Sequence, residues 1–337
     1  MRPMNGTDTG ALPPAFVSRL HRLLGGDGAG RVLAALAAPR RTAFRVNPLC
    51  CTDPGAALAE LAAAGVEPVP LEWLPGVFHV APDQRGALTR SGPVTRGELY
   101  IQNPASMLPP LALAPGSGDE VLDLAAAPGS KTLQLAAMVA APSQVAAVEA
   151  VRGRFFRLRA NLARHGAGAV RTYLKDGGRV WRRVGERFDA VLLDAPCSAE
   201  GQFHLSVPAS FAYWSERKVR EMAHKQRRLL ASAVHCARPG GVIVYATCTL
   251  APEENEAVVD AVLRRFPGVL EVEPVPLEVP GGLPGRTAWE DAVYDPRLAR
   301  ALRILPDGLM EGFFICRLRK TASTAGDSRG RRSSENW

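Results

Sequence analysis

The chain has 337 residues, of which 47% are hydrophobic and 22% are charged, and these proportions are typical of a folded protein rather than a disordered or fibrous one. It contains no apolar run of the about 18 residues that a membrane helix needs and no apolar core of a signal peptide near its start, so we expect a cytoplasmic protein without a membrane span. The net charge of +8 comes mainly from arginine and favours a polyanionic partner such as nucleic acid, although a GC-rich genome can produce the same bias.

The first 95 residues predict a small α+β module. Apolar residues recur at helical spacing over 15–37, where several glycines divide the helix in two. A short strand is expected at 43–49, and a helix at 56–65 that ends at a glycine. Two further strand candidates, rich in proline and glycine, cover 71–80 and 87–94.

From residue 96 the pattern changes to alternating strands and helices. The expected strands are 121–126, 144–150, 169–176, 188–196, 240–248 and 310–320. The expected helices are 130–139, 152–166, 215–237 and 253–266. Alternating elements with apolar strands predict an α/β domain over 96–320, with a mostly parallel, doubly wound sheet that is covered on both faces. The polar segment 321–337 has few bulky residues and is expected to be a disordered tail.

A loop of small residues follows the first strand of this domain and leads into a helix. Ligands bind at the carboxyl ends of strands in such sheets, and small residues let the backbone approach a ligand closely. The loop matches neither the dinucleotide pattern G-x-G-x-x-G nor a P-loop. The candidate cofactor-binding residues in it are Ala125, Ala126, Ala127, Pro128, Gly129, Ser130 and Lys131.

Two acidic residues end the next two strands of the predicted sheet. Glu149 ends the second strand, where a carboxylate can accept hydrogen bonds from the hydroxyls of a ribose. Asp176 ends the third strand, where it could accept from an adenine amino group. Either residue could instead be a helix-capping or loop carboxylate. If both carboxylates bind a ligand, the pair indicates a site for a cofactor that contains a nucleoside.

The six cysteines include no C-x-x-C pair, so we expect no zinc or other metal site, and without a secretory signal we expect no disulfide framework. Cys197 and Cys248 differ from the others because each ends an apolar strand in a polar loop, DAPCSAEG and YATCTLAPEENE. A buried, inert thiol is the common alternative for a free cysteine. We apply that alternative to Cys236 and Cys316, which lack a polar loop.

These motifs, in this order, resemble the RNA 5-methylcytosine methyltransferases of the RsmB/RsmF/NSUN family. The resemblance rests on DLAAAPGSKT, on the acidic positions 149 and 176, and on the two cysteine loops, and it covers residues 96–320. FRVNPL and YIQNPASML extend it weakly into the first region. It is nearest to the bacterial RsmF-like 16S rRNA enzymes, here without their extra C-terminal RNA-binding domain.

The resemblance implies a Rossmann-like class I methyltransferase domain with an antiparallel last strand. It implies S-adenosyl-L-methionine as cofactor, with the methionine part in the 124–131 loop, the ribose at Glu149 and the adenine at Asp176. It also implies that Cys248 is the nucleophile and that Cys197 assists product release.

The chemistry is consistent with these roles, because carbon 5 of cytosine becomes reactive once a thiolate adds to carbon 6. Asp194 could bind the ring nitrogen or the exocyclic amine of the base and also contribute to the cofactor site. Lys131 could orient a nearby phosphate or carboxylate.

We therefore expect a monomeric RNA cytosine-5 methyltransferase that acts on 16S rRNA or the small ribosomal subunit, with tRNA as the alternative substrate. A DNA cytosine methyltransferase, which takes its nucleophile from the position of Cys197, and a non-enzymatic RNA-binding assembly factor are the other hypotheses. The first region is expected either to dock RNA through Arg40, Arg41 and Arg45 or to act as a structural cap. After DAPCS the family usually has Gly-x-Gly, where this chain has Ala199, Glu200 and Gly201.

Overall fold

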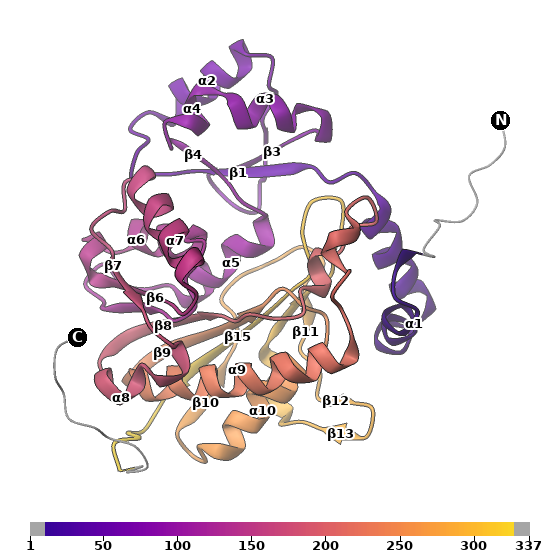
Figure 1. The fold of residues 1–337 in the computed structure, drawn as a ribbon, viewed down its shortest axis with the longest axis vertical. Helices are drawn as coiled ribbons and strands as arrows, with labels where there is room; N and C mark the ends of the chain where they lie inside the picture. The colour runs from indigo at the N-terminus through magenta and orange to yellow at the C-terminus, as the bar shows by residue number, and fades with distance from the viewer. Residues whose placement is uncertain (1–10, 327–337) are drawn as a thin grey trace.

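The computed structural model describes residues 11–326, which form a large sheet with helices on both faces and a smaller sheet beside it (Figure 1). Residues 1–10 of the predicted first module and residues 327–337 of the predicted tail lie outside the described residues. In this part of the chain, no helix combines the length and the apolar character that a membrane crossing requires.

The large sheet has the predicted doubly wound arrangement. Its principal strands are β5 (Val121–Asp123), β6 (Val145–Glu149), β7 (Arg171–Leu174), β8 (Phe188–Asp194), β9 (Ala237–Thr247) and β15 (Phe313–Lys320). They lie in the order β7-β6-β5-β8-β9-β15. The first five are parallel, and β15 is antiparallel to β9. The Rossmann-like fold with an antiparallel last strand is therefore confirmed, and it brings the carboxyl ends of β5 to β9 to one edge.

Both faces of the sheet are buried, as the continuous apolar strands predicted. The helices on one face are α5 (Pro104–Leu113), α6 (Ser130–Met138) and α7 (Arg152–Arg164). Those on the other face are α1 (Pro14–Ala37), α8 (Trp181–Val184), α9 (Glu216–Cys236) and α10 (Glu256–Arg265). In β8, Val191 and Leu193 join the core under α9, whereas Ala190 and Leu192 join the core under α6. This alternation follows the two-residue period of a strand.

Additional short strands, which the sequence did not predict, extend the sheet beyond β15. β10 (Leu270–Glu273) and β14 (Leu302–Ile304) pair antiparallel with different halves of β15. The remaining short elements are β11 (Leu283–Pro284), β12 (Ala288–Trp289), β13 (Ala292–Val293), η2 (Pro82–Gln84), η3 (Pro142–Gln144), η4 (Gly177–Arg179), η5 (Glu200–Gln202), η6 (Pro208–Ser210) and η7 (Pro296–Arg300). The strands β10 to β14 have too few residues to show a two-residue apolar period, so their extended conformation depends on pairing with the neighbouring strand.

The small sheet is built from β1 (Thr42–Val46), β2 (Val69–Pro70), β3 (Val77–Val80) and β4 (Leu99–Ile101), and it carries α2 (Pro54–Ala63), α3 (Arg85–Arg90) and α4 (Gly92–Thr95). The prediction of a strand at 87–94 is wrong, because this segment forms α3 and α4, with Pro93 in the first turn of α4. β4 pairs with β1, so the small sheet extends past the predicted boundary at residue 95.

The first helix does not belong to the small sheet. α1 bends at Gly25, whose φ of 71° breaks the helix as its glycines predicted. Its apolar residues pack into the core under α9, and the rings of Phe16 and Phe203 lie 4.9 Å apart. Figure 1 shows α1 well separated from α2, α3 and α4. Within the described residues 11–95, α1 and the small sheet therefore belong to different cores, which differs from the single module expected for this region.

The start of the predicted tail is ordered. The backbone N–H of Thr324 donates to Glu186 Oε1 at 2.5 Å, and the Lys320 ammonium donates to the Thr324 hydroxyl at 3.0 Å. The prediction of disorder is thus wrong for residues 321–324, because hydrogen bonds hold this segment against the end of β15 and the turn between α8 and β8.

Candidate active site

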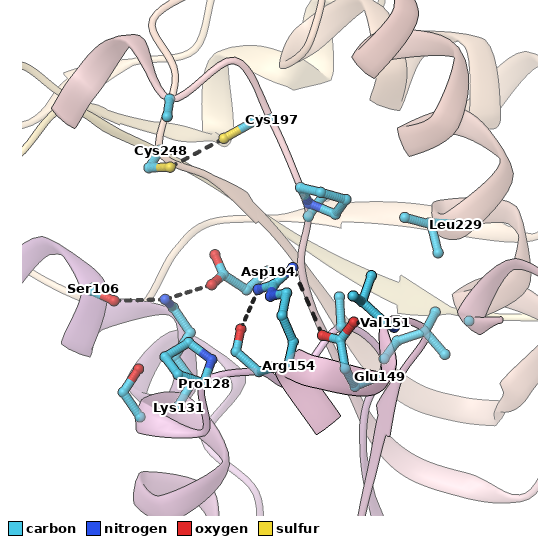
Figure 2. Close-up of a pocket in the computed structure, with 18 of the residues that line it drawn as sticks. Ser106, Pro128, Lys131, Glu149, Val151, Arg154, Asp194, Cys197, Leu229 and Cys248 are labelled. Carbon is cyan, nitrogen blue, oxygen red and sulfur yellow. Dashed lines mark hydrogen bonds and ion pairs between the residues drawn. The ribbon is translucent and has the colours of Figure 1, made fainter. Parts of the chain in front are cut away.

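A cavity of about 600 Å³ opens at the edge where the parallel strands end. Its wall includes most of the predicted site residues: Ala125, Ala127, Pro128, Ser130, Lys131, Glu149, Asp176, Asp194, Cys197 and Cys248. Ala126 and Gly129 do not line it, and they support the loop instead. Figure 2 shows the two thiols at one end of the cavity and Glu149 at the other, with Lys131 and Asp194 between them.

The loop of small residues is held open by backbone geometry and by α7. Gly129 has a φ of 111°, and a Cβ atom there would lie 2.9 Å from Leu158, so glycine is required at the start of α6. The Arg154 guanidinium donates to the Ala127 carbonyl at 2.5 Å, and Asn161 donates to the Pro128 carbonyl at 3.1 Å. These contacts occupy two carbonyls of the loop and fix its backbone around the cavity.

Carboxylates lie at the ends of β5, β6 and β7. Asp123, which the sequence analysis did not select, is buried and accepts from Thr132 Oγ1 at 2.6 Å through one oxygen. Its other oxygen has no hydrogen-bond partner among the described residues. Burial raises the pKa of Asp123 to about 7. Burying an oxygen without a hydrogen-bond partner costs folding free energy. The carboxyl group at the end of β5 therefore keeps one acceptor that the described residues do not use.

Glu149 and Asp176 both line the cavity, as predicted, and each also caps its local backbone. Glu149 accepts from the Val151 backbone N–H at 2.8 Å, and its second oxygen lies 3.8 Å from the Arg154 guanidinium. Asp176 accepts from the Gly178 N–H at 3.0 Å and lies 3.3 Å from Arg228. The two interpretations of these carboxylates are thus compatible, because the backbone contacts orient side chains that still face the cavity.

Lys131 and Asp194 form an ion pair in the middle of the cavity wall. Lys131 Nζ donates to Asp194 Oδ2 at 2.7 Å and to Ser106 Oγ at 2.6 Å (Figure 2). It also lies 5.3 Å from the centre of the Phe313 ring. The Lys131 side chain is only 7% exposed, compared with 32% for Asp194. The lysine therefore orients a carboxylate of the protein itself, one that still reaches the cavity.

The two predicted cysteines meet although they come from different strands. Cys197 Sγ and Cys248 Sγ are 3.1 Å apart (Figure 2). The hydrogen bond to Cys248, together with desolvation, raises the pKa of the Cys197 thiol well above its ordinary value. Either sulfur can be the donor in this contact. A thiol that donates to a neighbouring sulfur stabilises the anionic form of that sulfur, and the assignment of Cys248 as the nucleophile stays a prediction.

The loop that carries Cys197 is packed tightly against the end of β15. A Cβ atom on Gly201 would lie 2.1 Å from the Gly312 carbonyl oxygen, so this position requires glycine. The Gly201 N–H donates to the Cys248 carbonyl at 3.0 Å and links the two cysteine loops. Ala199 adopts a φ of 60°, a conformation that explains why a glycine is common at this position in the family that the motifs resemble.

The remaining cysteines lie away from the cavity. Cys236 and Cys316 are fully buried, and burial raises the pKa of the Cys236 thiol to about 12. Cys50 and Cys51 lie between β1 and α2, and neither lines the cavity. The structure thus separates the two cysteines in polar loops from the other four, as the loop context predicted.

The small sheet supplies one wall of the cavity. Tyr100 and Gln102 line the cavity, and Gln102 accepts from the buried Arg45 at 3.0 Å. Burial lowers the pKa of Arg45 to about 10. Arg40 is also engaged, since it donates to the Phe203 carbonyl at 2.5 Å. Of the three arginines selected as phosphate contacts, only Arg41 is exposed, so the expectation is wrong for Arg45.

Several cavity residues escaped the sequence analysis because no catalytic or cofactor-binding pattern marks their positions. They are Ser106 of α5, Arg154 of α7, Gln202 of η5, Lys225 and Arg228 of α9, and Glu311 before β15. Lys225 and Arg228 belong to the basic, exposed part of α9, and this charge pattern was the one available signal. The others are recognisable only once the fold has placed them.

A family model described as 16S rRNA methyltransferase RsmB/F matches residues 110–319 of the chain. The ribosomal RNA small subunit methyltransferase F of Cronobacter sakazakii is 38% identical over 93% of this chain and 64% of its own length. That of Erwinia tasmaniensis is 37% identical over 95% of this chain and 66% of its own length. The chain thus spans slightly less than two thirds of these relatives.

Solved structures have the same fold. A methyltransferase homologue from Pyrococcus horikoshii is 29% identical, with a TM-score of 0.77, over 93% of this chain and all of its own. The protein described as NSun6 from the same organism, in a structure with SFG, also reaches a TM-score of 0.77, at 21% identity, over 93% of this chain and 99% of its own. This second likeness concerns the fold alone.

Proposed function

Because the chain belongs to the RsmB/F family of 16S rRNA methyltransferases, we propose that it transfers a methyl group to carbon 5 of a cytosine in RNA. The observation that carries this proposal is the pair of sulfurs 3.1 Å apart at one end of a cavity whose other end holds Glu149. A covalent mechanism at a pyrimidine needs a thiolate and a methyl donor in one site, and this cavity offers a place for both.

The residues present fit S-adenosylmethionine as cofactor. Glu149 is nearly buried and faces the cavity, where it would accept from the ribose hydroxyls. Asp176 would accept from the adenine amino group, and the small residues of the 125–130 loop leave room for the methionine part. When bound, this cofactor supplies an electrophilic methyl group on a sulfonium. The names of the relatives, all methyltransferases, support the same choice.

The residues of the chain then act on the base. The Cys248 sulfur would bond to carbon 6 of the cytosine, which gives carbon 5 the electron density to accept a methyl group. Asp194, held by Lys131, would bind the ring nitrogen or the exocyclic amine as charge develops there. After methyl transfer, Cys197 would release its own proton to solvent and, as a thiolate, accept the carbon 5 proton. The double bond between carbons 5 and 6 would then re-form, and the Cys248 sulfur would leave with its electron pair.

Ribosomal RNA of the small subunit is the substrate that the relatives' names favour, and transfer RNA is the second candidate. A cytosine must leave its stack to reach Cys248, and RNA loops present such bases at low cost. The placement of both thiols supports methylation of RNA over DNA. A DNA cytosine methyltransferase takes its nucleophile from the position of Cys197 and would not need a second thiol at the position of Cys248. We further propose that the protein is cytoplasmic and acts as a monomer.

The proposal is tested by incubating the protein with small-subunit rRNA, tRNA and methyl-labelled S-adenosylmethionine, followed by nucleoside analysis. We expect label in 5-methylcytidine from the ribosomal RNA. Label that appears only with tRNA would select the second substrate. Absence of labelled 5-methylcytidine from every RNA, whether naked or in ribosomal particles, would contradict the proposed activity.

We predict that Glu149→Gln weakens S-adenosylmethionine binding by about 10- to 100-fold, because a buried charged acceptor typically contributes ~1.5–3 kcal/mol. Isothermal titration calorimetry measures this without RNA. Glu67→Gln, which changes an exposed glutamate next to the small sheet, is the matched control and should bind normally. Equal affinities for the Glu149 variant and the control would remove Glu149 from the cofactor site.

The amino-terminal half of α9 is our candidate for RNA docking. α9 follows the Cys197 loop, and Lys225 and Arg228, in the middle of the helix, line the cavity wall. Arg217 and Arg220 are exposed, and among the described residues neither has an ion-pair partner. Tyr213, directly before the helix, is 89% exposed. Free cations beside an exposed aromatic ring suit a single-stranded RNA segment.

Replacing Arg217 and Arg220 by glutamine should lower the salt dependence of RNA binding by about one unit per lost phosphate contact. The slope is measured by fluorescence anisotropy over a range of salt concentrations. The matched control replaces Arg182 and Arg183, two exposed arginines of α8, which precedes β8 and therefore lies toward the opposite edge of the sheet. Equal slopes for the two double variants would contradict the assignment of α9.

A further inference from the structure

The two sulfurs of the cavity are held close together by the backbone around them. Cys197 Sγ and Cys248 Sγ are 3.1 Å apart (Figure 2). β8 and β9 are neighbouring parallel strands, joined just before the cysteines, where the Ala195 N–H donates to the Ala246 carbonyl at 2.8 Å. The loops are joined again where the Gly201 N–H donates to the Cys248 carbonyl at 3.0 Å. The sulfur pair therefore lies between two fixed points of the backbone.

Side chains hold the same two loops. Ser198 Oγ and Thr249 Oγ1, each from the residue directly after one of the cysteines, are 2.8 Å apart. The Ser198 N–H donates to the buried Glu254 at 2.9 Å, and the Gln226 amide donates to the Pro196 carbonyl at 2.9 Å. The residues before and after the first cysteine are thus anchored, so the two sulfurs cannot separate without breaking several hydrogen bonds.

This arrangement is close to the geometry of a disulfide. A disulfide S–S bond is about 2.0 Å long, so the two sulfurs need to approach by about 1 Å. Disulfides join Cα atoms that are ~4.4–6.8 Å apart, and the neighbouring strands that lead into the two cysteines are about 4.8 Å apart. A group that is held beside its partner reacts far faster than the same group free in solution. The fixed loops therefore favour an S–S bond once one of the sulfurs is oxidised.

The sulfur pair can also be reached by small molecules. Both cysteines line the cavity of about 600 Å³, and both are partly exposed. Cys51, Cys236 and Cys316 are buried, and buried structural cysteines react poorly with reagents in solution. Cys50 is partly exposed but lies outside the cavity. A small oxidant that enters the cavity therefore meets two adjacent thiols.

We propose that Cys197 and Cys248 form a reversible disulfide when the protein meets a peroxide, and that this bond switches methylation off. The disulfide leaves neither sulfur free to bond to carbon 6 of the base or to accept the proton of carbon 5. A dithiol reductant restores both thiols by exchange and is itself oxidised to a disulfide. Formation of the bond needs no RNA, whereas the loss of methylation rests on the proposed function.

The oxidation consumes one peroxide molecule for each disulfide. One sulfur, as a thiolate, attacks a peroxide oxygen, so an S–O bond forms and the O–O bond breaks. The hydroxide that leaves takes up the proton that this thiol released and becomes water. The second sulfur then attacks the first, so the S–S bond forms and the S–O bond breaks. The proton of the second thiol leaves with that oxygen as a second water, so two thiols lose two electrons and two protons.

The direct test treats the full chain, reduced and then freed of reductant, with hydrogen peroxide. The remaining thiols are alkylated, and the protein is digested without reduction and analysed by mass spectrometry. We expect a cross-linked peptide pair that joins Cys197 to Cys248 and that dithiothreitol separates. Cys50→Ala, the control, should give the same cross-link. Wild-type protein in which either cavity cysteine ends as a sulfinic acid, or in which both stay reduced after Cys50 is oxidised, would overturn the proposal.

Single-cysteine variants test the pairing with a different oxidant. In Cys197→Ala or Cys248→Ala, the remaining cavity sulfur has lost its partner, so oxidised glutathione should leave one glutathione attached to it. In the wild-type protein the neighbouring sulfur should displace that glutathione and form the internal disulfide. Intact-mass measurements separate these products. Glutathione that stays attached to the wild-type cavity cysteines as it does in the variants would contradict the pairing.

Methylation is measured on the same peroxide-treated samples. Activity on RNA should fall in proportion to the cross-linked fraction and return after dithiothreitol. Binding of S-adenosylmethionine should be unchanged, because Glu149 and the loop of small residues take no part in the bond. Full activity in completely cross-linked protein, or loss of cofactor binding on oxidation, would overturn the switch. A reduced protein that methylates no RNA would contradict the proposed function, while the cross-link would still test the disulfide.

Discussion

Replacement of Cys248 by alanine is expected to reduce methyl transfer below detection and to leave no covalent protein–RNA complex. Replacement of Cys197 by alanine is expected to have the opposite effect on the complex, which should accumulate. The two sulfurs, 3.1 Å apart, have different roles in the proposed mechanism. Cys248 bonds to the base, and Cys197 assists the release of the methylated base. Denaturing gels of the variants incubated with S-adenosylmethionine and labelled RNA measure both effects.

Cys50→Ala is the control for these two variants, because Cys50 is partly buried outside the cavity. It should methylate RNA at the wild-type rate without accumulating a complex. A Cys197 variant that forms no adduct, together with a Cys248 variant that does, would reverse the assignment of the nucleophile. The chemistry at carbon 6 would then resemble that of DNA cytosine methyltransferases.

Asp194→Asn is expected to lower kcat by about 10²–10³-fold, the usual effect of removing one group that stabilises developing charge. The variant keeps the volume of the side chain but loses the charge that Lys131 holds toward the cavity at 2.7 Å. It also leaves the Lys131 ammonium, which is 7% exposed, without its carboxylate, so we expect a loss of about 1–3 kcal/mol in the free energy of unfolding. Steady-state kinetics and thermal denaturation measure the two effects.

Lys131→Met tests whether the two residues act as one unit. The two residues share an interaction, so their effects should not be independent. The double variant should therefore lose about as much activity as the less active of the two single variants, and less than the two fold-losses multiplied together. Asp83→Asn, an exposed aspartate near the small sheet, is the control. Wild-type kcat in the Asp194 variant would exclude this carboxylate from the chemistry.

The sequence predicted the large sheet well because its strands are short apolar runs that alternate with long amphipathic helices. It also predicted that Glu149, Asp176, Asp194 and both cysteines would meet, since each ends or follows a parallel strand and such strands end at one edge. β10 and β14 were missed because so short a strand forms only when β15 pairs with it.

Other parts of the site could not be predicted because they depend on contacts between distant segments. Ser106 lies 25 residues before Lys131, its partner, and no spacing rule connects them. Arg45 has the sequence context of a surface arginine, yet it is buried against the cofactor loop. Glu254 stands in the acidic run after Cys248, and only the fold shows that it turns inward to Ser198.

The most direct test of the account is to identify the sulfur that bonds to RNA. The protein–RNA complex formed in the presence of S-adenosylmethionine is digested with a nuclease and a protease, and the peptide that carries a cytidine nucleotide is sequenced by mass spectrometry. We predict that the nucleotide is attached to Cys248, through carbon 6 of a cytosine from small-subunit rRNA. Attachment to Cys197, or the absence of any such peptide while 5-methylcytidine is formed, would contradict the mechanism.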